Sequence, residues 1–241
     1  MESSEPGGAR DGNAGGEGSR AARGPVRGAR FGASPRAFLL SPAFCGGKRA
    51  QLLLSDRARF DLAGRLRAGE ATLGEVFSFL SGLYFRGKLA YATAFAAPPP
   101  GLAREAAVLV ITTCEGLLRA DERVSLERLR GFERVELDGR NPHYRRPLAR
   151  DARAVGEALG PGGEAVLLGS IATGKYVDAL LEVLGPRLVF PRAFVGRGDM
   201  SRGGLLLRCV EEGRELEYVP VAGAVRHGVR PPKLEPRPRR G

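Results

Sequence analysis

The segment GSIATGKY, residues 169–176, carries residue types at the spacing of a phosphate-binding loop. The pattern G-x-x-x-x-G-K-[ST] combines glycines that let backbone N–H groups approach a phosphate, a lysine that binds it, and a short hydroxyl side chain that binds Mg²⁺. Gly169, Gly174 and Lys175 fit this pattern, but Tyr176 stands at the hydroxyl position. The apolar runs also end without an Asp or Glu to hold the metal, which disfavours metal-dependent nucleotide hydrolysis. Binding of an anion without hydrolysis and a structural turn with a solvent-facing lysine both stay open.

A second group of polar residues, GRGDMSRGG, spans residues 196–204. Arg197 and Arg202 bracket Asp199, and two arginines so arranged can clamp a phosphate while they keep the carboxyl group ionised. Asp199 is therefore a candidate nucleophile, base or orienting group. A flexible loop with a local ion pair is the alternative interpretation.

Lysine is scarce in this chain. Its 38 basic residues include four lysines, each directly after Gly or Pro: Lys48, Lys88, Lys175 and Lys233. The ammonium group is compact and can lose its proton when buried, whereas the guanidinium group of arginine stays charged. A chain with this bias is expected to keep lysine mainly where the amine matters, with chance placement in a glycine-rich sequence as the alternative.

The hydrophobic pattern predicts the elements that position these groups. Continuous apolar runs of strand length, typical of strands buried on both faces of a parallel sheet, occupy residues 37–41, 106–113, 164–170 and 187–190. Segments with helical spacing or helix caps lie between these strands, at 48–69, 73–85, 86–96, 125–129, 144–160 and 174–185.

Two local signals support this assignment. Thr72 and Glu75 form a T-x-x-E capping box before an apolar helical run. Near the C-terminus, 204–210 and 214–221 flank Glu-Glu-Gly, which predicts a hairpin. The sequence therefore predicts an α/β fold, with a mostly parallel Rossmann-like sheet, flanking helices and a C-terminal antiparallel hairpin.

Ligands of open α/β sheets bind beyond the carboxyl ends of the parallel strands. Loops in that position, with 196–204 and His227, provide the candidate ligand-binding residues Ser41, Lys48, Gly169, Ser170, Thr173, Gly174, Lys175, Tyr176, Arg197, Arg202 and His227. Asp199 and Glu115 are the candidate catalytic carboxylates. Phe79, Tyr84, Phe85, Tyr91 and Phe95 are interpreted as mostly core rather than base-stacking residues.

Composition divides the chain into three parts. Residues 1–34 have almost no large apolar side chains and are predicted to be disordered, and 35–225 form a single α/β domain. Residues 226–241 form a basic tail that is also predicted to be disordered. The net charge of +11 fits a polyanionic partner such as DNA or RNA, although arginine-rich codon usage explains it equally well.

Other features narrow the class of protein. No apolar run is long enough to span a bilayer and the first residues lack the apolar segment of an export signal, so we expect a cytoplasmic protein without a membrane partner. Three separated cysteines argue against a disulfide framework. The sequence predicts neither a metal site nor a cofactor, and it leaves the oligomeric state open.

Several short segments resemble YaaA-like proteins of the peroxide response and the wider group with a uracil-DNA-glycosylase-like α/β fold. They are LLSPA (39–43), LSGLY (80–84), EGLLRAD (115–121) and KYVDALLEVLG (175–185). The resemblance implies a cytoplasmic protein that binds DNA or a nucleobase and is related to base-modifying enzymes. It points to Ser41, Gly116 and Tyr176 as functional positions.

Three functional hypotheses follow. The first is a protein that binds a nucleotide, nucleobase or nucleic acid, including the case of a metal-independent enzyme that acts on such a ligand. The second is a non-catalytic DNA- or RNA-binding protein of the stress-response type. The third is a nucleotide-binding protein with a degenerate phosphate loop.

Overall fold

The computed structural model describes residues 34–172, 174–232 and 234. Its helices are α1 (Lys48–Leu54), α2 (Asp61–Arg67), α3 (Leu73–Ser81), α4 (Leu83–Phe95), α5 (Leu126–Arg134), α6 (Pro142–Leu159), α7 (Gly174–Leu184) and α8 (Asp199–Glu212). Its strands are β1 (Arg36–Leu40), β2 (Val108–Ile111), β3 (Leu117–Arg119), β4 (Glu164–Leu168), β5 (Leu188–Pro191) and β6 (Tyr218–Pro220). Short 3-10 helices lie at Arg104–Ala107, Gly185–Arg187 and Arg192–Phe194.

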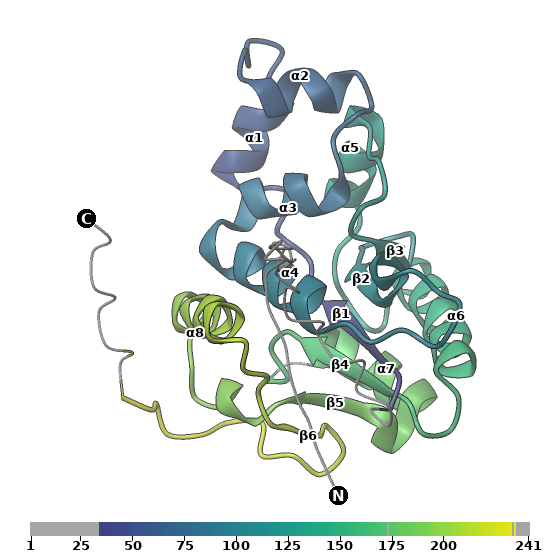
Figure 1. The fold of residues 1–241 in the computed structure, drawn as a ribbon. Coiled ribbons are helices and arrows are strands. Elements are labelled where there is room, and N and C mark those ends of the chain that lie inside the picture. The colour runs from purple at the N-terminus through teal and green to yellow at the C-terminus, as the bar shows by residue number, and fades with distance from the viewer. Residues whose placement is uncertain (1–33, 173, 233, 235–241) are drawn as a thin grey trace, which may run out of the picture. The chain divides into compact units, whose positions relative to one another are not determined.

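The strands form one sheet in the order β3-β2-β1-β4-β5-β6 (Figure 1). The four inner strands are parallel, and Leu40 of β1 lies opposite Val110 of β2 and Leu168 of β4. At the two edges of the sheet, β3 pairs antiparallel with β2 and β6 pairs antiparallel with β5. The predicted α/β fold, with a mostly parallel sheet and an antiparallel pair at the C-terminal end, is confirmed.

Helices cover both faces of the sheet. α4 packs against β1, β2 and α8 on one face, whereas α6 and α7 pack against each other and against β4 and β5 on the other (Figure 1). β1 and β4 are buried along nearly their whole length, as their continuous apolar sequences predict. The chain leaves β1 toward β2 on one side and later returns through β4 toward β5 on the other. The direction of winding therefore reverses between β1 and β4.

Local sequence signals fix several helix ends. Thr72 and Glu75 form the predicted capping box at the start of α3, with the Thr72 hydroxyl accepting from the Glu75 N–H and the Glu75 carboxylate accepting from the Thr72 N–H. Ser125 accepts from Arg128 N–H at the start of α5. At the end of α6, Gly160 adopts a φ of 69°, a value that few residues other than glycine adopt easily.

The single helical stretch predicted at 48–69 is wrong, because α1 and α2 divide it. Ser55 has an extended backbone and its hydroxyl accepts from the Arg57 N–H at 3.2 Å. Such a side-chain bond offers the backbone an alternative to the helical one. Phe60, also extended, then begins α2.

The largest correction concerns residues 196–210. The segment 196–204 was predicted to be a loop and 204–210 the first strand of a hairpin, but α8 begins at Asp199 and includes both. Gly203, Leu206 and Cys209 are its buried residues, at a helical spacing of three. A short apolar run does not by itself distinguish a buried strand from a buried helix, and here the packing against α4 decides. The C-terminal antiparallel pair consists instead of β6 and β5.

β3 was not predicted. Gly116 has a φ of 78°, and the Thr112 N–H and hydroxyl both donate to its carbonyl oxygen, at 2.8 and 3.0 Å. This tight turn brings the chain back along β2. Because three residues are too few to show a period, the hydrophobic pattern does not predict a strand here.

The predicted boundaries of the tails lie mostly outside the described residues, which begin at residue 34. Within the described part of the C-terminal segment, Arg226 forms an ion pair with Asp178 of α7 at 3.7 Å. No helix among the described residues is long and apolar enough to cross a membrane. Cys45, Cys114 and Cys209 are free thiols, in agreement with the prediction of no disulfide framework.

Candidate functional site

Facing glycines bring α4 and α8 into close backbone contact. A Cβ atom on Gly87 would lie 2.7 Å from the Gly203 carbonyl oxygen, and one on Gly203 would lie 2.8 Å from Leu83 O and Tyr84 Cα. Glycine at both positions is therefore required for this approach. As a result, the side chains that flank Gly87 on α4 lie next to those that flank Gly203 on α8.

The carboxyl ends of β1 and β4 meet these two helices. Ser41 follows β1, and its N–H continues the sheet by donating to Leu168 O at 3.1 Å. Gly169 follows β4, and a Cβ atom there would lie 2.8 Å from Ser41 Cβ and 2.7 Å from the Tyr176 hydroxyl. The absence of a side chain at Gly169 thus allows Ser41 and Tyr176 to approach each other. The reversal of winding between β1 and β4 is the position at which open α/β sheets bind ligands.

Lys88 of α4 is the charged group at the centre of this region. Its side chain is 1% exposed, and Nζ donates to the Ser41 carbonyl oxygen at 2.5 Å and to Ser41 Oγ at 2.8 Å. Nζ also lies 4.6 Å from the ring centre of Tyr84 and 4.7 Å from that of Phe85. The amine is therefore held by two oxygen atoms of one serine and by two aromatic rings.

Burial lowers the pKa of Lys88 to about 7, because the charged amine has lost its hydration. The Asp199 carboxylate opposes this shift, and the Arg202 guanidinium adds to it. A lysine with this pKa is half neutral near pH 7, so its amine can accept a proton as well as donate one. Such an amine is suited to acid–base chemistry.

Three tyrosine hydroxyls surround the serine side of this cluster. Burial raises the pKa of Tyr176, which interacts with the Ser170 backbone and the Ser41 side chain. The buried hydroxyl of Tyr144 has no hydrogen-bond partner among the described residues, whereas the Tyr84 hydroxyl interacts with the Arg202 side chain. Both hydroxyls also interact electrostatically with Tyr176. Since buried polar groups nearly always form a hydrogen bond, the Tyr144 hydroxyl is a group that a polar ligand or a water molecule could satisfy.

α8 contributes a cation and a carboxylate. The Arg202 side chain is 12% exposed, donates to Phe194 O at 3.1 Å and lies over the Phe194 ring. Asp199 is mostly exposed and lies 3.6 Å from Arg202. Both charges act on Lys88 and Tyr176. They form the outer, more accessible part of the cluster.

The structure brings six of the predicted residues together around Lys88: Ser41, Gly169, Ser170, Tyr176, Asp199 and Arg202. The others lie elsewhere. Arg197 is held locally by Ala193 O and Ser201 Oγ, at 3.0 and 3.2 Å. Lys48 and His227 are exposed. Thr173 lies outside the described residues.

Lys175 belongs to a different cavity. This cavity has a volume of about 570 Å³, and Gly174 and Lys175 line it together with Asp138, Arg140 and Asp178. Arg140 pairs with Asp138 at 3.0 Å, and Lys175 interacts electrostatically with the same carboxylate. Acidic groups thus already compensate the cations here, which makes the cavity less suited to an anion than the phosphate-loop pattern suggested.

Glu115 is held in a structural ion pair. Its carboxylate accepts from Arg128 at 2.6 to 3.0 Å, and the same guanidinium also pairs with Glu122 at 2.8 Å. This bidentate contact connects the turn after β2 to α5. The geometry assigns Glu115 to positioning of the chain and leaves no free carboxylate oxygen aimed at the Lys88 cluster.

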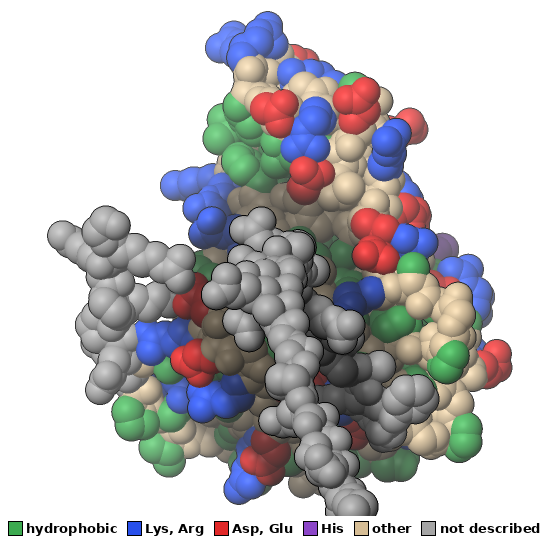
Figure 2. All heavy atoms as spheres, viewed as in Figure 1, with side chains coloured by type: hydrophobic (Ala, Val, Ile, Leu, Met, Phe, Trp, Pro, Cys, Tyr) green, Lys and Arg blue, Asp and Glu red, His purple; other side chains and the backbone are tan. Residues whose placement is uncertain are grey.

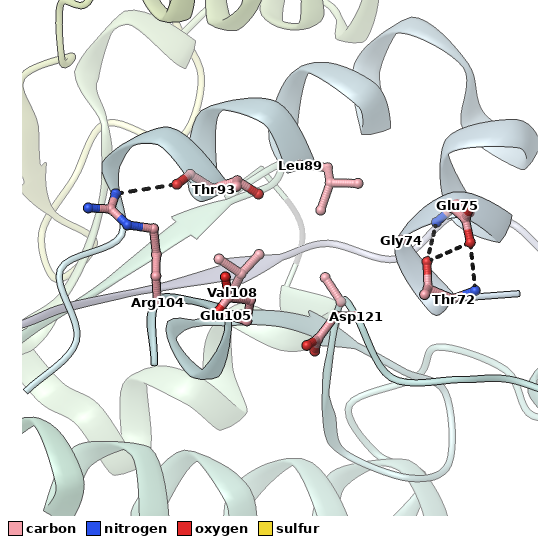
Figure 3. A pocket seen from close by; sticks show the side chains of 10 residues that line it. Thr72, Gly74, Glu75, Leu89, Thr93, Arg104, Glu105, Val108 and Asp121 are labelled. Carbon is pink, nitrogen blue, oxygen red and sulfur yellow. Dashed lines mark hydrogen bonds between the residues drawn. The ribbon is translucent and has the colours of Figure 1, made fainter. Parts of the chain in front are cut away.

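A smaller cavity of about 200 Å³ lies between α3, α4 and the β2–β3 edge (Figure 3). Leu89 and Val108 form its apolar part, and the carboxylate of Asp121 lies at its margin. Arg104 donates to the carbonyl oxygen of Thr93 at 3.3 Å, which ties the turn before β2 to the end of α4. This volume lies below the usual range for ligand pockets.

Exposed cations gather on the segment from Lys48 to Arg67. Arg49, Arg59 and Arg67 donate to backbone carbonyl oxygens rather than to carboxylates, at 3.1, 2.8 and 2.8 Å. Phe44 is 78% exposed beside this segment, and Leu52 is 54% exposed. Figure 2 shows basic and hydrophobic side chains next to each other over α1 and α2.

Sequence reasoning did not assign Lys88 and Tyr84 to the site. Tyr84 was interpreted as core, which its burial agrees with, but its ring lies 4.6 Å from Lys88 Nζ and its hydroxyl interacts with Arg202. Lys88 had one sequence signal, namely its place among the few lysines of an arginine-rich chain. The sequence does not show that α4 and α8 cross, because no local pattern indicates which helices pack together.

Comparison with protein-family models, with curated proteins and with solved structures finds no match for this chain. The YaaA-like resemblance therefore stays a prediction. Within the described residues, no group of three or more His, Cys, Asp or Glu side chains is arranged to hold a metal ion.

Proposed function

We propose that this protein binds a nucleotide or nucleobase at the carboxyl ends of β1 and β4. The observation that carries the proposal is the buried Lys88 beside Ser41, at the point where the winding of the sheet reverses. Nucleotides bind at this position in doubly wound sheets. A buried amine at that point favours an anionic or strongly polar ligand.

Arg202 and the tyrosines support the same ligand class. A guanidinium that is 12% exposed can bind a phosphate at the rim with its directional N–H groups. The hydroxyl of Tyr144, which has no hydrogen-bond partner among the described residues, offers a further hydrogen bond to a polar ligand. Together these groups could bind the charged phosphate of a nucleotide and the hydrogen-bonding edge of a nucleobase.

The test is a thermal-shift screen in the presence of a chelator, with nucleoside monophosphates, triphosphates and free nucleobases. We expect a ligand to stabilise the wild type, by about 2.7 kcal/mol at a concentration of 100 times its Kd. Arg202→Gln should reduce the ligand-induced shift, whereas Lys175→Gln in the separate cavity should not. An equal shift in Arg202→Gln, or a shift lost only in Lys175→Gln, would contradict the assignment.

A second candidate function is non-catalytic binding of DNA or RNA through α1 and α2. The exposed cations and the adjacent Phe44 favour it, because phosphates attract the charges and bases stack on exposed aromatic rings. Fluorescence anisotropy with short oligonucleotides at increasing salt tests it. Lys48→Ala and Arg57→Ala should each lower the salt dependence by about one counterion, and Arg153→Ala on α6 is the control. Salt-independent binding, or equal effects of all three substitutions, would reject it.

A further inference from the structure

We propose that Ser41 is a nucleophile activated by Lys88 as general base, and that this pair cleaves a phosphate ester or anhydride through a phosphorylated serine. The identity of the substrate rests on the proposed function, since it is the nucleotide that supplies the phosphate. The serine–lysine pair itself rests on the geometry of β1 and α4.

Two hydrogen bonds orient the amine toward the serine hydroxyl. The Ser41 carbonyl oxygen accepts one N–H of Lys88 at 2.5 Å, and Oγ lies 2.8 Å from the same nitrogen. When the amine is neutral, its lone pair can face the Oγ–H group over that distance. This is the contact that a base needs to remove the proton of a nucleophile.

The groups that face Lys88 come from its own helix, from the end of β1 and from α8. Tyr84 and Phe85 of α4 contribute their ring faces, Ser41 follows β1, and Asp199 and Arg202 on α8 contribute one negative and one positive charge. The two α8 charges oppose each other, so desolvation decides the protonation of Lys88. The neutral amine is therefore well populated at neutral pH.

The surroundings of Ser41 fit a nucleophile that meets a phosphate. Ser41 is buried, with 8% of its surface exposed, and Gly169 beside it carries no side chain that would cover the serine. Arg202 is close enough to act on Lys88 and Tyr176, the two groups that contact Ser41, and its guanidinium can stabilise the charge of the phosphoryl oxygens.

The step balances without a metal or a redox partner. Ser41 Oγ forms a bond to phosphorus while its proton passes to Lys88 Nζ, and the bond from phosphorus to the leaving oxygen breaks. Lys88 then returns the proton to that oxygen. Water attacks the phosphoserine in the second half, with its proton taken by Lys88, and Ser41 regains a proton as its bond to phosphorus breaks.

Diisopropyl fluorophosphate tests the pair directly, because its phosphorus forms a bond to an activated serine with loss of fluoride. We expect one equivalent of label at Ser41, found by intact-mass and peptide mass spectrometry. The labelling rate should rise with pH and level off above about pH 7, as Lys88 loses its proton. This pH profile is measured on the wild type and needs no variant.

Variants separate the two roles. Ser41→Ala should remove the label, and Lys88→Met should slow labelling by about 100-fold or more, which is the usual contribution of a general base. Lys175→Met is the control and should label at the wild-type rate. Absence of label in the wild type, label on another residue, or unchanged labelling in Lys88→Met overturns the proposal and leaves Lys88 with a structural role.

The substrate class has its own test. We expect slow hydrolysis of bis(p-nitrophenyl) phosphate in the presence of a chelator, lost in Ser41→Ala, and hydrolysis of p-nitrophenyl acetate alone would overturn the phosphate assignment. Failure of the proposed function is distinguishable from these outcomes. Labelling of Ser41 without any nucleotide-induced thermal shift rejects the nucleotide, whereas a thermal shift without labelling rejects the nucleophile.

Discussion

Lys88 and Lys175 resemble each other in sequence and differ in almost every physical respect. Each follows a glycine, and each is one of the few lysines in the chain. Lys88 is buried, forms hydrogen bonds with Ser41 and has a lowered pKa. Lys175 is exposed at the rim of a cavity that Asp138 and Asp178 also line. The lysine in the recognisable motif is the one with ordinary surroundings.

The comparison shows that a motif locates a loop more reliably than it locates a functional side chain. Successive residues of a helix point about 100° apart, so Lys175 and Tyr176 on the first turn of α7 face different directions. Tyr176 turns inward to Ser41, and Lys175 turns outward. The residue that departs from the phosphate-loop pattern is thus the one that reaches the candidate site.

The largest expected difference between the two lysines is in the pH dependence of stability. Because the folded-state pKa of Lys88 lies near 7 and its ordinary value is 10.5, the unfolded chain holds this proton more tightly between these values. The free energy of unfolding should therefore rise with pH across this window, by up to about 1.4 kcal/mol per pH unit. Urea unfolding between about pH 7 and pH 9.5 should show this rise in wild type relative to Lys88→Met. Lys175→Met should run parallel to wild type, and a parallel profile for Lys88→Met would contradict the lowered pKa.

The next effect tests the helix crossing that places Lys88. Gly203→Ala should destabilise the fold by about 1–3 kcal/mol, because its Cβ atom would press on the α4 backbone at Leu83 and Tyr84. Gly204→Ala, one residue later in α8, meets only Leu234 Cδ1 at 3.5 Å and should be neutral or stabilising by about 0.5–1 kcal/mol. Chemical denaturation measures both, and equal effects would show that the close approach does not hold α4 to α8.

The capping box of α3 should have a smaller effect. Thr72→Ala removes the hydroxyl that accepts from the Glu75 N–H and should cost about 1 kcal/mol. The hydrogen bond from Arg65, followed by the contacts with Thr72, lowers the pKa of Glu75 to about 2, so part of this stability should be lost as pH falls from 4.5 toward 2. Thermal unfolding of wild type and Thr72→Ala at neutral and acidic pH checks this. A difference that does not shrink in acid would argue against the Glu75 contribution.

The smallest effect on stability is expected for Lys175 and Glu115, two predicted site residues that lie away from the Lys88 cluster. Lys175→Ala and Glu115→Gln should each change stability by no more than about 1 kcal/mol, since Lys175 is exposed and the Glu115–Arg128 ion pair is partly exposed. Neither should change the labelling of Ser41 or the nucleotide-induced thermal shift. Loss of either readout in Lys175→Ala would move the functional site from the Lys88 cluster to the neighbouring cavity.

The sequence predicted most of the fold because its signals are local. Apolar runs marked β1, β2, β4 and β5, and the caps at Thr72 and Ser125 marked the starts of α3 and α5. It missed β3, whose three residues are too few for a period. It also took part of α8 for a strand, because a short apolar run fits both structures until its packing partner is known.

The loops of the candidate site could be predicted from the sequence, but Lys88 at its centre could not. Ser41, Gly169 and Tyr176 could be suspected because they follow buried parallel strands, and such strands end at one edge of a sheet. Lys88 lies inside a helix, where neither a strand end nor a motif marks it. Its role depends on burial, on the two oxygens of Ser41 and on α8, which comes more than a hundred residues later in the chain.

The sequence by itself determined the class of fold, the loops at its carboxyl edge and the unusual status of lysine in this chain. Hydrophobic period and capping residues are local properties, so they can be interpreted without knowing what packs where. The tertiary structure alone decided which lysine is buried and which is exposed. Burial and a lowered pKa arise from contacts among β1, α4, α7 and α8, and these contacts exist only once distant segments have come together.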